Sequence, residues 1–184
     1  METLHSIRKN IWQQLTKTQT EEEHPFRLAT FATSNENTPN MRVAIIRKIN
    51  QELAEIWFYT DYYSQKVQDI KDNNNINWLF YDPKEQTQVR LYGNAQVLHN
   101  PTANYYIRKN LPEYSNQDYL TVQLSGDSKS SNPILFEAGQ GNKNFCIIKT
   151  KIHTIDWLQL TQKGYLQAKF ELKNNEWKGE WLSS

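Results

Sequence analysis

The sequence holds little of what several protein classes require. A single cysteine, Cys146, excludes an internal disulfide, and a formal net charge of +1 lacks the basic excess that nucleic-acid-binding proteins usually carry. No apolar run approaches the roughly 20 residues of a membrane-spanning helix, and the amphipathic N-terminus lacks the continuous apolar stretch of a signal peptide. These absences favour a globular, cytoplasmic protein whose 184 residues form a single domain.

Residues of conventional catalytic and metal sites are also scarce. The four histidines, His5, His24, His99 and His153, have no metal-ligand spacing, so we expect no metal site. Cys146 lies inside an apolar strand pattern, which favours an inert buried thiol over a nucleophile, and no G-x-S-x-G elbow is present. If the protein is an enzyme, we therefore expect a cofactor to carry the chemistry.

Aromatic residues, by contrast, are abundant: six Trp, ten Tyr and seven Phe suit β-rich packing or a flat ligand. Helical spacing of apolar residues predicts an N-terminal helix at 2–17, within a segment 1–20. About seven strands and three or four short helices follow, which predict a mainly β protein, a closed or split β-barrel with peripheral helices. The strand patterns lie at 26–33, 41–48, 55–60, 76–82, 87–98, 144–160, 164–172 and 176–182, the further helices begin near 64, 100 and 115, and a flexible loop is expected at 125–142.

The stretch EIWFYTDYYSQK, residues 55–66, carries the first hint of function. It passes from an apolar strand pattern to hydroxyls and a cation, Thr60, Ser64 and Lys66, at the start of a short helix. Because a helix N-terminus attracts anions, one interpretation is a phosphate site. The alternative is that Ser64 only caps the helix and Lys66 is a solvated side chain.

Arg42 and Gln88 extend the phosphate interpretation. Arg42 begins the run Val43–Ile46, which is apolar without alternation, as in a buried strand. In a small barrel the ends of successive strands can converge, so that Arg42 and Lys66 would offer a cationic fork and a point charge to phosphate. An apolar wall and the Gln88 amide would suit a flat heteroaromatic ring. Together these residues predict a site for a phosphorylated planar cofactor.

The chain from about Phe26 to Leu98 resembles a known family in the order and spacing of its motifs. MRVAIIRK at 41–48, FYTDYYSQK at 58–66 and TQVRLYG at 87–93 are specific in combination. They are similar to the pyridoxamine 5′-phosphate oxidase-related family of FMN-binding split barrels. The resemblance implies an FMN-binding split β-barrel and a homodimer with FMN at the subunit interface. It also implies a small-molecule substrate, with no nucleic-acid or membrane partner.

The resemblance also implies which residues contact FMN. Arg42, Ser64 and Lys66 would bind the phosphate, and Gln88 would reach the ring from a neighbouring strand. The full implied set is Arg42, Val43, Ala44, Ile45, Ile46, Arg47, Tyr59, Thr60, Ser64, Gln65, Lys66, Gln88, Ser128 and Lys169.

The implied substrate residues depart from the family pattern. Tyr165 and Gln167 stand where the oxidase has an arginine and a histidine, and Arg47 replaces a lysine that contacts both flavin and substrate. Gln65 likewise stands where an arginine is usual, which removes one phosphate cation. Tyr106 matches a tyrosine that contacts the substrate phosphate. The substrate set is therefore Arg47, Tyr106, Tyr165 and Gln167.

These features predict an FMN-dependent oxidoreductase, in which a small substrate passes a hydride equivalent to the flavin. No residue is assigned as a catalytic acid or base. One alternative is a binding module of the same fold, such as a flavin carrier or a binder of haem or deazaflavin. Another is a flavin reductase that uses NAD(P)H, because the sequence does not identify the electron donor.

Overall fold

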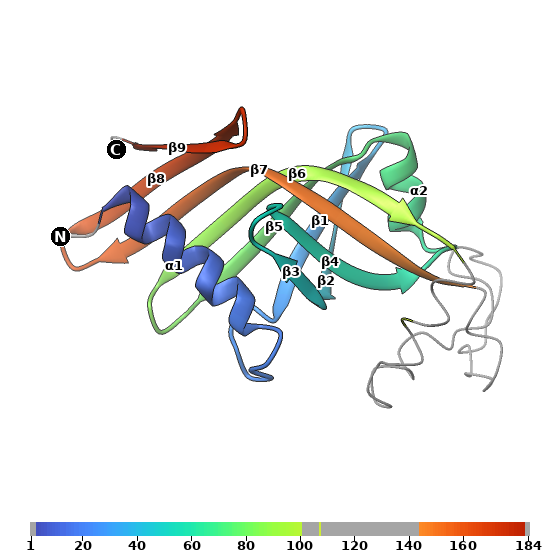
Figure 1. Cartoon of the computed structure of the whole chain (residues 1–184), viewed down its shortest axis with the longest axis horizontal. Helices are drawn as coiled ribbons and strands as arrows, with labels where there is room; N and C mark the ends of the chain where they lie inside the picture. The colour runs from blue at the N-terminus through green and yellow to red at the C-terminus, as the bar shows by residue number, and fades with distance from the viewer. Residues whose placement is uncertain (1–2, 101–106, 108–143, 183–184) are drawn as a thin grey trace.

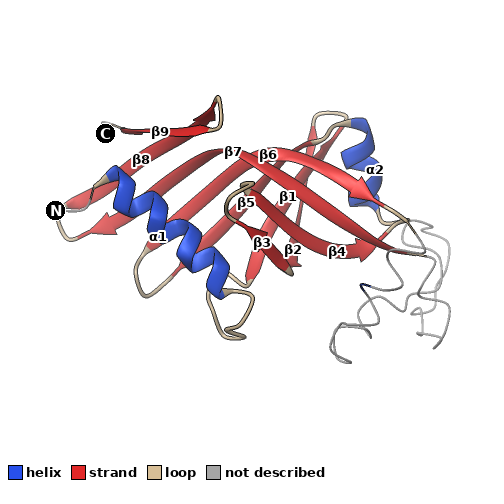
Figure 2. Ribbon diagram, viewed as in Figure 1, coloured by secondary structure: helices blue, strands red, loops and turns tan. Residues whose placement is uncertain are grey.

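Caps and turns in the sequence set where the elements of this chain begin and end. Thr3 caps the first helix, because its hydroxyl accepts a hydrogen bond from the backbone N–H of Ser6. Asn174 and Asn175, both with positive φ, form the turn between the last two strands. The computed structural model describes residues 3–100, 107 and 144–182, which form two helices and nine strands (Figures 1 and 2). Their bounds are α1 (Leu4–Lys17), β1 (Leu28–Asn35), β2 (Thr38–Ile45), β3 (Lys48–Asn50), β4 (Glu55–Asp61), α2 (Gln65–Asp72), β5 (Asn75–Asp82), β6 (Thr87–Leu98), β7 (Phe145–Thr161), β8 (Gly164–Lys173) and β9 (Glu176–Trp181).

Most of the expected elements in the described ranges are confirmed, and β6 has the bounds that the sequence predicts. The strand predicted at 41–48 is wrong in extent, since β2 ends at Ile45 and β3 begins at Lys48. Apart from Ile107, the helices and the loop expected between residues 101 and 142 lie outside the described residues. No helix in the described ranges is long and apolar enough to cross a bilayer.

The sheet divides along its longest strand, as Figure 1 shows. The strands pair in the order β2-β1-β5-β6-β7-β4-β3. One edge of β7 pairs with β6. The other edge is shared by two strands, because residues 145–151 pair with β4 and residues 154–161 pair with β8. His153 is an extra residue in the β6–β7 ladder, a bulge that bends β7 where it changes partner. Gly93 faces this bulge, where a Cβ would overlap the backbone carbonyl of Lys151. The predicted split β-barrel with peripheral helices is confirmed.

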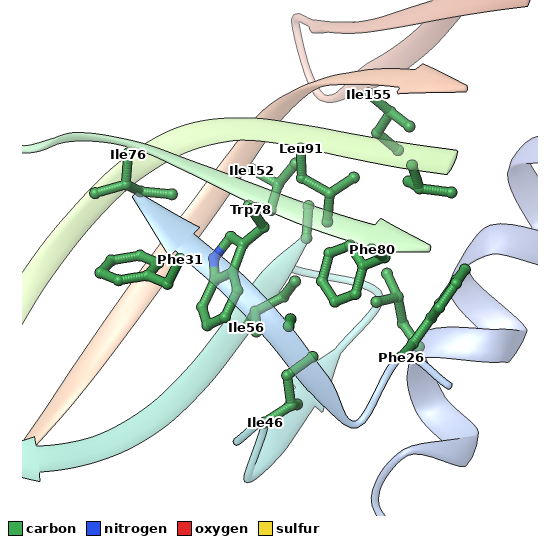
Figure 3. Close-up of a cluster of buried hydrophobic side chains, with 14 of the residues drawn as sticks. Phe26, Phe31, Ile46, Ile56, Ile76, Trp78, Phe80, Leu91, Ile152 and Ile155 are labelled. Carbon is green, nitrogen blue, oxygen red and sulfur yellow. The ribbon is translucent and has the colours of Figure 1, made fainter. Parts of the chain in front are cut away.

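Aromatic and aliphatic side chains together form the buried core (Figure 3). The ring centroid of Phe31 lies 4.7 Å from those of both Phe58 and Trp78. The indole N–H of Trp78 donates to the Thr150 hydroxyl (3.2 Å), which donates in turn to the carbonyl of Ile56 (2.8 Å). Each fully buried ring contributes about 1.5–3 kcal/mol to folding, so this cluster fixes the strands that carry the site.

The expectation that Val43–Ile46 is a buried strand is wrong. β2 is an edge strand whose side chains alternate between the two faces of the sheet. Ala44 and Ile46 are buried in the barrel, whereas the side chain of Val43 is 66% exposed on the outer face. The apolar run therefore reflects a strand with two apolar faces. One face is buried in the barrel, and the other is exposed in the single chain.

Candidate functional site

The N-terminus of α2 lies directly after β4, so that strand residues and first-turn residues of the helix are brought together. Ser64 occupies the N-cap position with extended backbone, but its side chain makes no capping hydrogen bond. Its hydroxyl instead donates to the carbonyl of Asp61 (2.7 Å). The interpretation of Ser64 as only a capping side chain is therefore wrong: its hydroxyl caps no N–H of the first turn, and the N–H of Val67 donates to the Ser64 carbonyl instead (3.0 Å).

Lys66 is turned toward the end of β4. Its ammonium donates to the Thr60 hydroxyl (3.0 Å), which lies 3.5 Å from the Ser64 hydroxyl, and both hydroxyl residues are buried. Burial lowers the pKa of Lys66, and the positive charge of Arg42 lowers it further. Lys66 is thus not a freely solvated side chain but one of two neighbouring cations that repel each other. Arg42, Thr60, Ser64 and Lys66 are named the α2 cluster below.

Arg42 is tied to a buried carboxylate, that of Asp69. One of its terminal nitrogens donates to the Thr33 hydroxyl (2.7 Å), and the other lies 3.6 Å from the Asp69 carboxylate. Asp69 is fully buried and accepts hydrogen bonds from Thr33 (2.6 Å), Gln65 (2.9 Å) and Asn40 (3.2 Å). Burial alone would raise the pKa of Asp69, but these hydrogen bonds and the charge of Arg42 hold it below its ordinary value.

Sequence reasoning missed Asp69, Thr33 and Asn40. A signal for the first existed, because Asp69 lies between Val67 and Ile70 on the buried side of a short amphipathic helix. An acid in that place needs several hydrogen-bond donors. Nothing in the sequence pattern identifies which strand residues supply them.

The α2 cluster fits a phosphate monoester. Thr60, Ser64 and Lys66 lie together at the helix N-terminus, and the charge of Arg42 acts on Lys66 from nearby, while the Asp69 carboxylate offsets part of the charge of Arg42. Oxygen anions with several lone pairs satisfy such donors best. The structure therefore brings Thr60, Ser64 and Lys66 into contact, with Arg42 near enough for its charge to act on Lys66.

Gln88 is not brought to the α2 cluster within one chain. Arg42 turns toward the barrel side, where it meets Thr33, whereas Gln88 lies on the outer face of β6, beside Tyr81 of β5. Val43 and Ile45 face outward as well. The expected convergence of strand ends on one ligand is thus absent from the single chain, because the side chains leave opposite faces of the sheet.

The C-terminal candidates also lie on the outer face. Tyr165, Gln167 and Lys169 follow one another on the same side of β8, opposite the buried Ala168 and Phe170. Lys169 forms an ion pair with Glu171 (2.9 Å), which raises the pKa of Lys169. Hydrogen bonds from Lys173 and from Lys169 lower the pKa of Glu171 to about 2.

The remaining candidates have different surroundings. Tyr59 packs against Phe145, with ring centroids 5.1 Å apart, and the backbone N–H of Arg47 donates to the carbonyl of Trp57 (2.9 Å). Cys146 is fully buried, and burial raises its pKa to about 12, which confirms an inert thiol. Tyr106 and Ser128 lie outside the described residues.

Comparison with known sequences identifies one family. The family described as "Pyridoxamine 5'-phosphate oxidase, FMN-binding domain" matches residues 5–99. Pyridoxine/pyridoxamine 5'-phosphate oxidase of Psychrobacter cryohalolentis is 33% identical over 102 residues, 54% of this chain and 45% of that protein. The enzyme of Psychrobacter arcticus is 33% identical over 108 residues, 59% of this chain and 49% of that protein. The chain thus spans about half the length of the curated relatives it matches.

Solved structures share the fold over nearly the whole chain. A pyridoxamine 5'-phosphate oxidase-related, FMN-binding protein of Nostoc punctiforme superposes with a TM-score of 0.75 at 18% identity, covering 96% of each chain. PhzG of Burkholderia lata, solved with tetrahydrophenazine-1-carboxylic acid, gives 0.73 at 14% identity and covers 97% of this chain and 92% of its own. At these identities the likeness establishes the split-barrel fold alone.

We expect Asp69→Ala to lower the free energy of unfolding by about 2–4 kcal/mol at pH 7, because buried donors lose their acceptor. The pKa of Asp69 is lowered from 3.8 by folding, so its charged form stabilises the fold above that pH. This contribution declines as the pH falls below 3.8 and is lost below the lowered pKa. Urea unfolding of both proteins between pH 7 and pH 2 measures the difference.

The exposed Asp72, at the end of the same helix, provides the matched control. Asp72→Ala should change stability by less than about 0.5 kcal/mol. A difference between wild type and Asp69→Ala that stays constant down to pH 2 would contradict the assignment of Asp69 as an ionised, hydrogen-bonded carboxylate.

Proposed function

The chain belongs to the pyridoxamine 5′-phosphate oxidase FMN-binding family and its cofactor is FMN, and we propose that it is an FMN-dependent oxidoreductase acting on a small molecule. The observation that carries the proposal is the α2 cluster, whose paired cations and hydroxyls fit the phosphate end of FMN. The curated relatives bear the name of an oxidase, which supports the same reaction class.

In the proposed site the protein binds and orients FMN, and FMN would supply the chemistry. Arg42 and Lys66 hold the phosphate with the hydroxyls of Thr60 and Ser64. When bound, FMN supplies the two-electron chemistry by accepting a hydride equivalent from an amine or alcohol carbon. The residues around it need only fix the ring and exclude water, so no strong acid or base is required among them.

The proposal includes a homodimer with FMN at the subunit interface. The outer face of β1, β2 and β5 exposes a row of large apolar side chains that an isolated chain leaves in water. Gln88 and Lys169 share this outer face, so a second copy placed against it would present them to the FMN held by its partner's α2 cluster. The exposed side chains are those of Met41 (71%), Val43 (66%), Leu28 (62%), Tyr81 (50%) and Leu79 (38%).

We expect Arg42→Ala and Lys66→Ala each to weaken FMN binding by about 2–4 kcal/mol, because a phosphate dianion loses a charge-assisted partner. Riboflavin, which lacks the phosphate, should bind both variants as it binds wild type. Fluorescence titration with the two ligands measures the difference.

Lys71→Ala provides the matched control, since Lys71 is on the same helix but its ammonium lies over the Tyr62 ring, 4.3 Å from the centroid. It should leave the FMN affinity unchanged.

Because the pKa of Lys66 is lowered, the FMN affinity of wild type should also fall with rising pH below 10.5, and Lys66→Ala should remove this dependence. Normal FMN binding by Lys66→Ala would contradict the proposed site.

We expect a stable homodimer at micromolar concentration, and Leu28→Lys should weaken it at least about tenfold by placing a charge in an apolar contact. FMN affinity should fall with the dimer. Leu53→Lys is the control, because Leu53 is also exposed but lies in the β3–β4 turn. Sedimentation of wild type as a monomer that retains FMN would rule out a shared site.

We expect pyridoxine and pyridoxamine 5′-phosphates to be poor substrates even though FMN binds. Tyr165 and Gln167 are uncharged where the family places an arginine and a histidine. Each missing charge-assisted contact costs roughly 1.5–3 kcal/mol, ten- to a hundredfold or more in affinity. In an assay where dioxygen takes the two electrons from the reduced flavin, hydrogen peroxide release measures turnover. A Michaelis constant in the micromolar range with ordinary turnover would identify a vitamin B6 oxidase instead.

A further inference from the structure

The proposed FMN site depends on Arg42 being held in one direction, and the structure contains a device for this. We propose that Thr33 is the positioning residue of Arg42 and that the buried Asp69 carboxylate fixes the direction of the Thr33 hydroxyl. The inference rests on the proposed phosphate site and adds to it a residue that does not itself touch the phosphate.

The direction of the Thr33 hydroxyl follows from the chemistry of its two neighbours. A hydroxyl has one proton to donate, an ionised carboxylate can only accept, and a guanidinium can only donate. The Thr33 proton must therefore point to Asp69, at 2.6 Å, and a lone pair must face Arg42, at 2.7 Å. Thr33 is 3% exposed, so water scarcely competes for either bond.

The bond to Thr33 is the strongest restraint on Arg42 among the described residues. The same nitrogen lies 3.5 Å from the carbonyl of Phe31, and the guanidinium carbon lies 5.9 Å from the centre of the Phe31 ring. The contact with Asp69 is also long, at 3.6 Å. The short, directional hydrogen bond to Thr33 thus sets the orientation of the Arg42 guanidinium, because the longer contacts with Phe31 and Asp69 tolerate rotation.

The pairing register of β1 and β2 explains why Thr33 can reach Arg42. On the ladder of β1 and β2, Arg42 is paired with Phe31 and Thr33 with Asn40, so Thr33 lies diagonally across from Arg42 on the same face. Asp69 approaches that face from α2, where it also receives the Asn40 amide. The hydroxyl therefore connects the helix to the strand arginine.

Holding Arg42 in place before the ligand arrives lowers the cost of binding. A free arginine loses rotamer entropy when it is immobilised on a ligand, whereas an anchored one has already lost it during folding. The gain applies only to ligands that use Arg42. Loss of the Thr33 hydroxyl should therefore weaken binding of the phosphate end and not of the ring.

The test compares FMN with riboflavin on Thr33→Val, which keeps the shape of the side chain and removes its hydroxyl. We expect FMN to bind roughly tenfold more weakly and riboflavin to bind as in wild type. Thr33→Ser, which retains a hydroxyl, should restore FMN affinity to within about threefold. In an Arg42→Ala background, Thr33→Val should have no further effect on FMN.

Thr150→Val is the matched control, because it also removes the hydroxyl of a buried threonine that makes two hydrogen bonds. Thr150 is fully buried, accepts from Trp78 and donates to Ile56, away from the α2 cluster. It should lower thermal stability without changing the ratio of FMN to riboflavin affinity. If Thr33→Val does not fold, Thr33→Cys carries the same comparison, because a thiol is a weak donor and a weak acceptor.

Four results would overturn the inference, and they separate it from the proposed function. Equal losses of FMN and riboflavin in Thr33→Val would show a merely structural role. A loss that persists in the Arg42→Ala background would show that Thr33 does not act through Arg42. If Arg42→Ala binds FMN weakly and Thr33→Val binds it normally, only the positioning role of Thr33 is overturned. If Arg42→Ala binds FMN normally, both the proposed site and the positioning role are overturned.

Discussion

A fully buried carboxylate connects the two parts of the chain that carry the candidate anion site. Asp69 belongs to α2, and its acceptor oxygens are satisfied by side chains from β1 and β2, more than 25 residues earlier in the sequence. An uncompensated buried charge would cost several kcal/mol, so the helix can dock only where Thr33, Asn40 and Arg42 are already aligned. The charge that would otherwise destabilise the fold therefore determines where the N-terminus of α2 lies.

The division of the sheet has the second large consequence. Because β7 pairs first with β4 and then with β8, the strand that leads into α2 and the strand that carries Lys169 lie along the same edge of β7. Their functional side chains nevertheless leave opposite faces. In the proposed function, one chain therefore presents two incomplete halves, one for the phosphate at α2 and one for the ring on the outer face. A ligand with a phosphate at one end and a flat ring at the other would need both.

The sequence predicted the fold well, but it predicted the surroundings of the candidate site residues poorly. Lys66 and Ser64 follow a clear strand pattern, and Arg42 begins another, so local signals were enough to propose a phosphate site. Thr33 and Asn40 sit at ordinary positions in a strand ladder, where side-chain partners across the sheet and from a helix leave no local trace. The same limit explains Val43, whose apolar run has one face inside the barrel and the other outside.

Gln65 shows how the three-dimensional contacts revise a reading based on residue type. By type, a glutamine in place of an arginine removes a cation from the phosphate site. In the structure, its amide donates to Asp69 at 2.9 Å and so stabilises the carboxylate that anchors Arg42. An arginine there would have competed with Arg42 for the same carboxylate. Asp69 offsets much of the charge of Arg42, and the negative charge of Asp61 also acts on Lys66, so little net positive charge is left for the proposed phosphate dianion. The remaining attraction must come from directed hydrogen bonds and the α2 N-terminus, so the alignment of these donors matters more than the number of charges.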